Sequence, residues 1–547
     1  MHTVTIALIL LLAVLASGFF ARLLPIKVPL PLVQIATGAG LAYGFGINVP
    51  LDPEFFFLFF IPPLLFLDGW RIPKSAFFRD VRPITTLAIG LVLFTVLGMG
   101  YFIHWMIPSV PLAAAFALAA ILSPTDPVAV SAIASQSPIP PRLMHILEGE
   151  ALLNDASGLV CFRFALAAVI TGTFSFLDAS MEFLWAAGGG LLVGILVAWL
   201  IGVANKWLVV FAGEDPGSQI LISLLLPFAA YLLAEHLQVS GILAAAAAGI
   251  TTHYTDMVGR RLAATRMQRR AVWDTIQMAL NGVIFVILGA QLRTTMDGLP
   301  LVANNMGLNS AWWLALYVIA IGVALTVLRF IWVWSSLRFT LFRKRRQPGD
   351  IKPSIRILLL TACAGVRGAI TLAGILTLPL LMPDGSAFPA RDLLIFLAKG
   401  VILLSLLSAS VALPLLSKGV KFRPEPLLGM DEGHARVAAA EAAIRHIKSV
   451  SDAAPVDAEN SGHTEAAMRV TELYRRRLDY GLREGEEAAR IQLLAEKERE
   501  LRLSAIRAER DELFQMWLHN KLDDTLHQRL LRELDLIEGA LTRNSPP

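Results

Sequence analysis

Charged side chains are scarce in this sequence. Only 16% of its 547 residues are Asp, Glu, Lys or Arg, whereas 56% are hydrophobic. A soluble protein usually carries about a quarter charged residues. The few charges are also concentrated, because 41 of the 90 lie from Met430 onward, in the last fifth of the chain. The composition therefore excludes a wholly soluble protein and indicates a membrane domain, 1–429, followed by a water-soluble tail, 430–547.

Cysteine is almost absent. The two cysteines, Cys161 and Cys363, lie in apolar segments, which excludes a disulfide framework or a zinc site built on cysteine. The tail has no nucleotide-binding fingerprint or metal-binding motif, and the net charge of +4 gives no indication of nucleic-acid binding. The N-terminus lacks a basic n-region, and its positive charge follows the apolar run at Arg22 and Lys27. We therefore expect a first membrane span there rather than a signal peptide. Because the motifs named above are absent, we expect no cofactor.

Long apolar runs, by contrast, are abundant. About 20 apolar residues are enough to cross a bilayer as a helix. Thirteen windows of this kind occur, at 3–24, 29–47, 54–70, 83–107, 112–135, 145–172, 182–206, 218–237, 240–256, 271–292, 311–338, 354–381 and 392–417. The sequence therefore predicts an all-α polytopic membrane protein with 13 transmembrane helices.

The positions of the basic residues provide an independent check on this number. With the N-terminus outside, the inner connections hold twenty Lys and Arg residues, whereas the outer connections hold only Arg293 and Arg391. Basic residues are enriched in cytoplasmic connections. One missed span would move every later connection to the opposite side of the membrane and remove this bias. We therefore expect the N-terminus outside and the tail in the cytoplasm.

Two predicted spans contain residues that interrupt helices. The fifth span includes LSPTDPVAVSAIAS, residues 122–135, in which Pro124 and Pro127 flank Asp126. Proline interrupts a helix because it lacks an N–H and clashes with the preceding turn. Freed backbone groups at membrane depth are tolerated only where they line a cavity or pack inside protein. We therefore expect the fifth span to consist of two half-helices.

The twelfth span contains CAGVRGAITLAG, with Gly365, Gly368 and Gly374 around Arg367. An offset of seven spans gives the two interrupted segments opposite directions, as expected for two inverted six-helix repeats whose broken helices cross. We expect Asp126 to offset the N-terminal ends of the half-helices and Arg367 their C-terminal ends. A purely structural role for Asp126 and a combined role as structural charge and ion ligand both fit this pattern.

The sixth span carries a cluster of polar residues. The segment LMHILEGEALLNDASGLVCFRF places Glu148, Glu150, Asn154 and Asp155 within eight residues. Glu150 and Asn154 share a helix face, and Asp155 follows about 100° further around the helix. With Asp126 on the preceding span, two carboxylates can share a hydrated cavity.

Such a pair of carboxylates predicts a specific chemistry. A hard monovalent cation prefers oxygen ligands, and a carboxylate holds either a cation or a proton. A carboxylate presented alternately to each side of the membrane therefore exchanges one for the other. The neighbour of Asp155 is the neutral Asn154, which favours one proton per Na⁺ and electroneutral exchange. The alternative role of Asn154 is a hydrogen bond that packs helices.

Other charged residues within the spans require partners, because an unpaired charge at membrane depth is costly. We expect Glu150 to pair with Arg329 in the eleventh span, with Arg163 as the alternative. Asp68 lies near a span end and is interpreted as interfacial, and Lys399 in the thirteenth span has no predicted partner.

With these residues identified, the chain resembles the cation:proton antiporter family that includes bacterial NhaP-type Na⁺/H⁺ antiporters and animal Na⁺/H⁺ exchangers, and within it the bacterial YjcE type. The resemblance covers FIPPLLFLDGW, LSPTDPVAVSAI, EGEALLNDASGLV, LPFAAYLLAEHLQVSGILAA, NGVIFVILGAQL, AGVRGAITLAG and FPARDLLIFLAKGVILLS, in this order. It implies a secondary transporter, not an enzyme, that exchanges Na⁺, or Li⁺ or K⁺, for H⁺ in pH and sodium homeostasis. It also implies a homodimer embedded in the lipids of a bacterial inner membrane.

The family's pattern assigns roles to individual residues. Asp155 is the main carrier of ion and proton, with Na⁺ bound at Asp155 and Asp126. Thr125 contributes its carbonyl at the helix crossing, Asn154 belongs to the electroneutral pattern, and Arg367 lies in the second broken helix.

The same resemblance implies a division of the membrane domain. Spans 1–3 and 8–10 form a dimer and scaffold part, spans 4–6 and 11–13 form a moving core, and Glu150 pairs with Arg329. One departure concerns the position after that glutamate, where several relatives have a serine whose hydroxyl helps to coordinate the ion. Here Ala151 removes that ligand, so that water or Thr125 would replace it.

Some patterns leave other function classes open. Asp126 and Asp155 on neighbouring helices would also suit an intramembrane aspartyl protease, although its YD and GxGD contexts are absent. A hydrolase dyad of Ser157 and His145 is disfavoured, because twelve residues of one helix, about 18 Å, separate them. A passive channel is a third alternative, without coupling to a pH gradient.

The tail, 430–547, alternates charged and apolar positions at helical spacing, and 451–463 (SDAAPVDAENSGH) is a predicted linker. We expect three or four helices, and the heptad pattern is too irregular for a coiled coil. Regulation of transport and stabilisation of a dimer are both compatible with this tail.

Overall fold

The computed structural model describes residues 2–25, 28–47, 53–134, 141–172, 176–258, 263–300, 302, 312–343, 355–418, 432–452, 465–475, 486–519 and 521–542. The chain forms two compact units, Met1–Lys421 and Phe422–Pro547. Within the described residues the regular structure is helical, apart from an isolated antiparallel bridge between Leu381 and Ala387. The all-α prediction is therefore confirmed.

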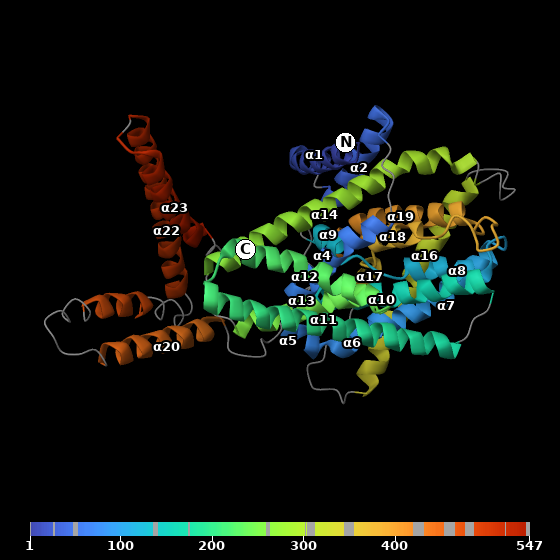
Figure 1. Cartoon of the computed structure of the whole chain (residues 1–547), viewed down its shortest axis with the longest axis horizontal. Helices are drawn as coiled ribbons and strands as arrows, with labels where there is room; N and C mark the ends of the chain where they lie inside the picture. The colour runs from blue at the N-terminus through green and yellow to red at the C-terminus, as the bar shows by residue number, and fades with distance from the viewer. Residues whose placement is uncertain are drawn as a thin grey trace. The chain divides into compact units, whose positions relative to one another are not determined.

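The first unit is a bundle of helices (Figure 1). Its helices are α1 (His2–Leu23), α2 (Leu30–Phe45), α3 (Pro53–Phe59), α4 (Ile61–Arg71), α5 (Lys74–Arg79), α6 (Val81–Thr85), the π-helix η1 (Thr86–Leu91), α7 (Val92–Met106), α8 (Leu112–Leu122), α9 (Pro127–Ala134), α10 (Pro141–Thr171), α11 (Phe176–Ala212), α12 (Pro216–His236), α13 (Gly241–Val258), α14 (Ala263–Asp297), α16 (Trp312–Arg343), α17 (Ile355–Cys363), α18 (Ala369–Leu376) and α19 (Arg391–Ser417). Each window predicted from the sequence coincides with one helix or with consecutive short helices.

Eight helices in the described part of the chain have the length and composition to cross a membrane. Two shorter apolar helices, α2 and α8, accompany them. Many large apolar side chains of these helices are exposed, for example Trp185 at 67% and Leu192 at 62% on α11. Since exposed apolar surface on this scale is costly in water, these faces suit contact with lipid.

The third predicted span is more segmented than expected, whereas the fifth and twelfth are interrupted as predicted. The third window consists of α3 and α4, which separate at Phe60, and α4 begins with Pro62 and Pro63 in its first turn. Proline is tolerated there because the first N–H groups of a helix have no partner within it. The fifth and twelfth windows also divide, into α8 with α9 and α17 with α18.

The fourth window contains a π-helix. Helices α6, η1 and α7 follow one another from Val81 to Met106. A π-turn holds one residue more than an α-helical turn, so some of its backbone groups lie outside the regular pattern of helical hydrogen bonds. The carbonyl of Ala88 accepts a hydrogen bond from Ser157 Oγ of α10 at 2.6 Å, and that of Thr86 accepts one from Trp332 Nε1 of α16 at 3.2 Å. The irregular segment thus joins α10 and α16.

Helices α2 and α14 pack with their backbones in contact. A Cβ atom added to Gly38 of α2 would overlap the carbonyl oxygen of Val286, and one added to Gly289 of α14 would overlap that of Ile35. Helices α4 and α13 meet in the same way, through Gly249 and the carbonyl of Phe66. Such close approach requires glycine on the contacting face and leaves little freedom for one helix to slide along the other.

A buried ion pair joins three other helices. Arg329 of α16 donates hydrogen bonds to both carboxylate oxygens of Glu150 on α10, at 2.5 and 2.7 Å. Its Nε donates to the carbonyl of Thr361 on α17 at 3.0 Å. The side chains of Arg329 and Glu150 are 2% and 1% exposed, so this is the expected pair in a dry environment. Arg163, the alternative partner, lies instead 3.5 Å from Glu235 at a more exposed position.

The second unit contains three long helices and a short helical run at 465–475 among its described residues. The long helices are α20 (Glu432–Asp452), α22 (Glu486–Leu518) and α23 (Asp524–Thr542). Helices α22 and α23 lie side by side, and Arg510 donates to Asp535 and Glu538 at 2.7 and 2.6 Å (Figure 1). Of the predicted linker 451–463, residues 453–463 lie outside the described residues.

We predict that Gly38→Ala destabilises the protein, whereas Gly40→Ala on the same helix does not. The added methyl group at Gly38 meets the backbone of α14, and nothing lies within 4 Å of a Cβ at Gly40. Overpacking of this kind costs about 1–3 kcal/mol. The melting temperature of each variant in detergent measures the difference. It is determined from the fraction that still elutes as a monodisperse peak after heating. Equal melting temperatures for the two variants would contradict the backbone contact.

We also predict that Arg329→Ala is strongly destabilising. Removal of one partner from a buried pair leaves an uncompensated charge and costs about 3–5 kcal/mol. The control is Arg163→Ala, which removes an ion pair whose side chains are 66% and 36% exposed and costs less than about 1 kcal/mol. The same detergent assay compares them, and a double variant, Glu150→Leu with Arg329→Met, regains part of the loss. A stable but inactive Arg329→Ala protein would argue for a direct role in transport.

Candidate functional site

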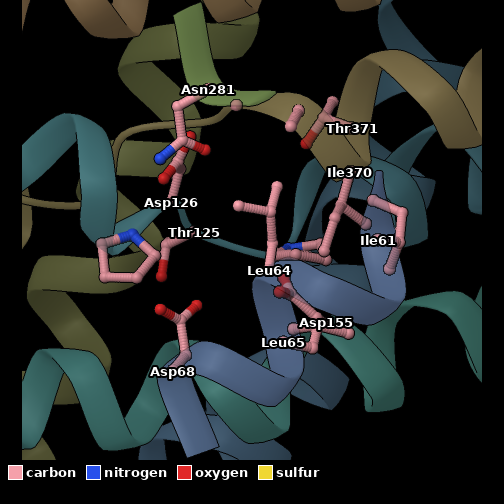
Figure 2. A pocket seen from close by; sticks show the side chains of 14 residues that line it. Ile61, Leu64, Leu65, Asp68, Thr125, Asp126, Asp155, Asn281, Ile370 and Thr371 are labelled. Atoms are coloured by element: carbon pink, nitrogen blue, oxygen red, sulfur yellow. The ribbon is translucent and has the colours of Figure 1, made fainter. Parts of the chain in front are cut away.

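A cavity of about 50 Å³ lies beside the two interrupted helix pairs (Figure 2). Its polar lining consists of three carboxylates and three neutral side chains, namely Asp68, Asp126, Asp155, Thr125, Thr371 and Asn281. The apolar side chains of Ile61, Leu64 and Ile370 complete the wall. One ordered water needs about 10–15 Å³ of such volume, so the cavity has room for a few waters or a partly hydrated small cation.

Helix α10 positions Asp155 and Asn154. Asp155 is 7% exposed and lines the cavity. Asn154 is 1% exposed, and its Nδ2 donates to Thr125 Oγ1 at 2.9 Å. Thr125 lines the cavity and Asn154 lies behind it, so Asn154 orients a lining residue. The Oδ1 atom of Asn154 is buried and has no hydrogen-bond partner among the described residues.

Asp126 lies where two half-helices begin. Its Oδ1 accepts a hydrogen bond from the N–H of Ala129, 3.3 Å away, in the first turn of α9. A Cβ atom on Gly368, the residue before α18, would overlap the Asp126 carboxylate. The carboxylate therefore lies against the start of both α9 and α18. Unpaired N–H groups give such helix ends a partial positive charge, which a carboxylate stabilises.

Arg367 occupies the complementary position at two helix C-termini. Its Nε donates to the carbonyl of Leu122, the last residue of α8, at 3.0 Å, and its Nη1 donates to the carbonyl of Gly365 just after α17. Its own N–H donates to Ser405 Oγ at 3.1 Å. The guanidinium thus satisfies carbonyls that the breaks release, as its charge requires.

The residues of the breaks also pack against their surroundings. Pro127 is the first residue of α9. Pro124 lies against α10, because a Cβ on Gly158 would come within 2.5 Å of its ring. Gly365 leaves space for Arg329, whose Cδ would lie 2.9 Å from an added Cβ. The two breaks meet directly, since the N–H of Asp126 donates to the carbonyl of Val366 at 2.7 Å.

Three carboxylates line the cavity. The charge of Asp155 interacts with those of Asp126, Asp68 and Glu150, and Asp68 also interacts with Glu148. Clustered carboxylates in a low-dielectric cleft attract cations and focus their field there. Among the described residues, no three His, Cys, Asp or Glu side chains converge closely enough to hold a metal ion. The polar side chains are therefore spaced along a largely apolar wall and do not converge on one point.

Three lining residues were missed by the sequence analysis. Asp68 was interpreted as interfacial, but it lines the cavity from α4, and Figure 2 shows its carboxylate directed towards Thr125. Asn281 of α14 and Thr371 of α18 also line it. The available signal was a polar residue in an apolar segment, which is a functional candidate at membrane depth.

The structure also bears on the hydrolase dyad. Ser157 Oγ donates to the carbonyl of Ala88 and lies within hydrogen-bond distance of carbonyls on its own helix. His145 lies near Glu148, with its Nδ1 3.6 Å from the carboxylate. The serine is thus bonded to backbone and not to the histidine, as the spacing along α10 predicted.

Comparison with known proteins places the chain in a family. Residues 7–419 match the family described as sodium/hydrogen exchanger, transmembrane. The chain is 43% identical to the uncharacterized Na⁺/H⁺ exchanger YjcE of Escherichia coli (strain K12) over 98% of both chains. It is 40% identical to a sodium, potassium, lithium and rubidium/H⁺ antiporter of Bacillus pumilus, over 95% of this chain and 75% of that protein.

A solved structure shares the fold. The sodium proton antiporter MjNhaP1 of Methanocaldococcus jannaschii superposes with a TM-score of 0.56 and 18% identity, covering 76% of this chain and 98% of that one. The resemblance predicted from the motifs is therefore confirmed. The chain belongs to the sodium/hydrogen exchanger family of multi-pass membrane transporters.

Proposed function

We propose that the protein exchanges Na⁺ for H⁺ across the membrane by alternating access, using Asp155 as the shared carrier. The observation that carries this proposal is the position of Asp155 in a small cavity, shared with Asp126 and Asp68, beside the two broken helix pairs. A carboxylate in such a place binds a proton or a cation, and each displaces the other. Exposure of the cavity to one side and then the other couples the two fluxes.

The cation is held by oxygen atoms that the cavity already provides. Asp155 and Asp126 supply charge, while the Thr125 and Thr371 hydroxyls supply neutral oxygen. The Thr125 hydroxyl is oriented by Asn154, which accounts for an amide at that position. Because a cavity of about 50 Å³ has room for only a few waters, direct coordination replaces part of the hydration shell of the ion.

Potassium is a second candidate cation. The Bacillus pumilus relative is named as an antiporter of sodium, potassium, lithium and rubidium, and a Bacillus subtilis relative of the same name is 43% identical over 422 residues. Ala151 stands where the family resemblance implies a serine in several relatives, and we propose that neutral oxygens from Thr125 or water complete the site. A site completed by water or by Thr125 is less closely fitted to one ion than a site completed by a serine at position 151. Such a site suits a transporter that accepts K⁺ and Li⁺ as well as Na⁺.

We also propose the membrane arrangement. Thirteen crossings form two inverted repeats of six, with α11 between them, and place the N-terminus outside and the tail in the cytoplasm. The matched breaks between α8 and α9 and between α17 and α18 support the repeat. The bias of twenty inner basic residues against two outer ones supports the orientation.

The cellular setting follows from the same proposal. The protein acts as a homodimer in the inner membrane of a bacterium, in contact with lipid, and serves pH and sodium homeostasis. Spans 1–3 and 8–10 form the dimer and scaffold part, and spans 4–6 and 11–13 form the moving core. The tail, 430–547, is a cytoplasmic helical domain.

Asp155→Asn is expected to abolish exchange, because the amide neither binds a proton nor balances a cation. The assay is Na⁺-driven recovery of a pH-sensitive dye inside proteoliposomes. Asp392→Asn is the matched control, since that carboxylate is 64% exposed and lies outside the cavity. Na⁺-dependent dye recovery that persists in Asp155→Asn, at a rate near that of the control, would reject the carrier role.

Exchange by the unaltered protein is expected to be insensitive to membrane potential. One proton moves per cation because Asn154 is neutral and Arg329 compensates Glu150. The potential is imposed with a thiocyanate gradient, which avoids K⁺, and the initial rate of proton movement is compared with and without it. A rate that follows the potential would contradict electroneutrality. Asn154→Asp adds an acidic group and is expected to make the rate respond.

A further inference from the structure

The ligands around the cavity belong to two separately braced sets of helices. Thr125 and Asp126 come from the break between α8 and α9, Asp155 from α10 and Thr371 from α18. Asn281 reaches the same cavity from α14, and Asp68 reaches it from α4. The site is therefore assembled at a boundary rather than within one rigid body.

The first set is held together by polar contacts. Arg329 links α10, α16 and α17 through Glu150 and the carbonyl of Thr361. Arg367 links the ends of α8 and α17, and the N–H of Asp126 bonds to the carbonyl of Val366. The bonds of Arg367 and of the Asp126 N–H satisfy groups at the helix breaks, and Arg329 pairs a buried charge. Separation of these helices would therefore leave buried polar groups unpaired. We therefore expect this set to move as a unit.

The second set is fixed by backbone contact. Helix α14 packs on α2 through Gly38 and Gly289. Next to Asn281, a Cβ on Gly282 would come within 2.5 Å of Val14 on α1 and within 3.0 Å of the Gln34 amide on α2. Since α1 and α2 enclose α14 at this point, Asn281 cannot follow a displacement of the first set.

The side chain of Asn281 has the position and chemistry of an ion ligand. Figure 2 shows its side chain directed towards Asp126 at one end of the cavity. Within the described residues its amide makes no hydrogen bond, although the residue is half-buried in an otherwise apolar stretch of α14. A half-buried amide that faces the cavity without a protein partner is available to coordinate a cation or a water that enters there.

We propose that Asn281 is a specificity-determining ligand whose amide oxygen coordinates the transported cation in only one of the two access states. This inference rests on the exchange mechanism proposed above. When the first set of helices moves, Asp155, Asp126 and Thr125 carry the cation away from α14, and Asn281 stays behind. Its oxygen is neutral, so it adds a ligand where Ala151 provides none and adds no charge to a cavity with three carboxylates. Cation affinity therefore differs between the two faces of the membrane.

The test measures apparent KM for Na⁺ from each face separately, in right-side-out and inside-out vesicles. Asn281→Leu keeps the side-chain size and is expected to raise KM about tenfold on one face, which corresponds to about 1.4 kcal/mol. On the other face KM stays within about twofold, and Vmax changes little on both. Asn281→Ser, which retains a shorter oxygen, gives a smaller rise on the same face.

Two control variants define the alternatives. Thr125→Val removes a ligand that travels with the ion and is expected to raise KM on both faces. Gln291→Leu removes another amide of α14, whose buried Oε1 has no partner among the described residues, and is expected to leave KM unchanged.

The outcomes separate the two proposals. An equal rise on both faces, or a lower Vmax with unchanged KM, would overturn the role of Asn281 and leave the exchange mechanism standing. Failure of the unaltered protein to move protons in response to Na⁺ on either face would overturn both. If Asn281→Leu does not reach the membrane, the test uses Asn281→Ser instead. An apparent KM for Na⁺ that is unchanged on both faces in Asn281→Ser overturns the inference.

Discussion

The architecture depends on the contact between two interrupted helix pairs whose exposed ends are compensated by one acid and one base. Four helix ends meet at this point, and each presents backbone groups without helical partners. Asp126 lies against the two N-terminal ends, and Arg367 bonds to carbonyls at the two C-terminal ends. Without these two charges the breaks would expose unpaired N–H and C=O groups at membrane depth, where no water offsets them.

The charges of Asp126 and Arg367 stabilise the two helix breaks, and these breaks also form the cavity. Because the helices stop at the crossing, side chains from both breaks face a shared space, which Asp155 of the continuous α10 also lines. Glu150 lies on the same helix as Asp155, and its buried pair with Arg329 holds α10 against α16 and α17. The helix that carries Asp155 is thus fixed by a buried ion pair.

Much of this was predictable from local chemistry. Apolar runs define the helices because a helix must satisfy its backbone within lipid. Prolines and glycines indicate the breaks, and a buried Glu150 requires a cation that Arg329 supplies. The roles of Asp68 and Asn281 were not predictable, since their direction depends on how α4 packs on α13 and α14 on α2. Sequence spacing describes neighbours along one helix, whereas a cavity is defined by helices remote in the chain.

The π-helix η1 has a consequence for the permitted length of the chain. Its extra residue turns the start of α7 by about 100° relative to an uninterrupted α-helix. The same irregularity directs the carbonyls of Thr86 and Ala88 towards Trp332 and Ser157. Loss of one residue between 86 and 91 would rotate every later side chain of α7 away from its present neighbours. Substitutions are therefore easier to accommodate in this segment than single-residue deletions, so homologous chains should vary here in composition before they vary in length.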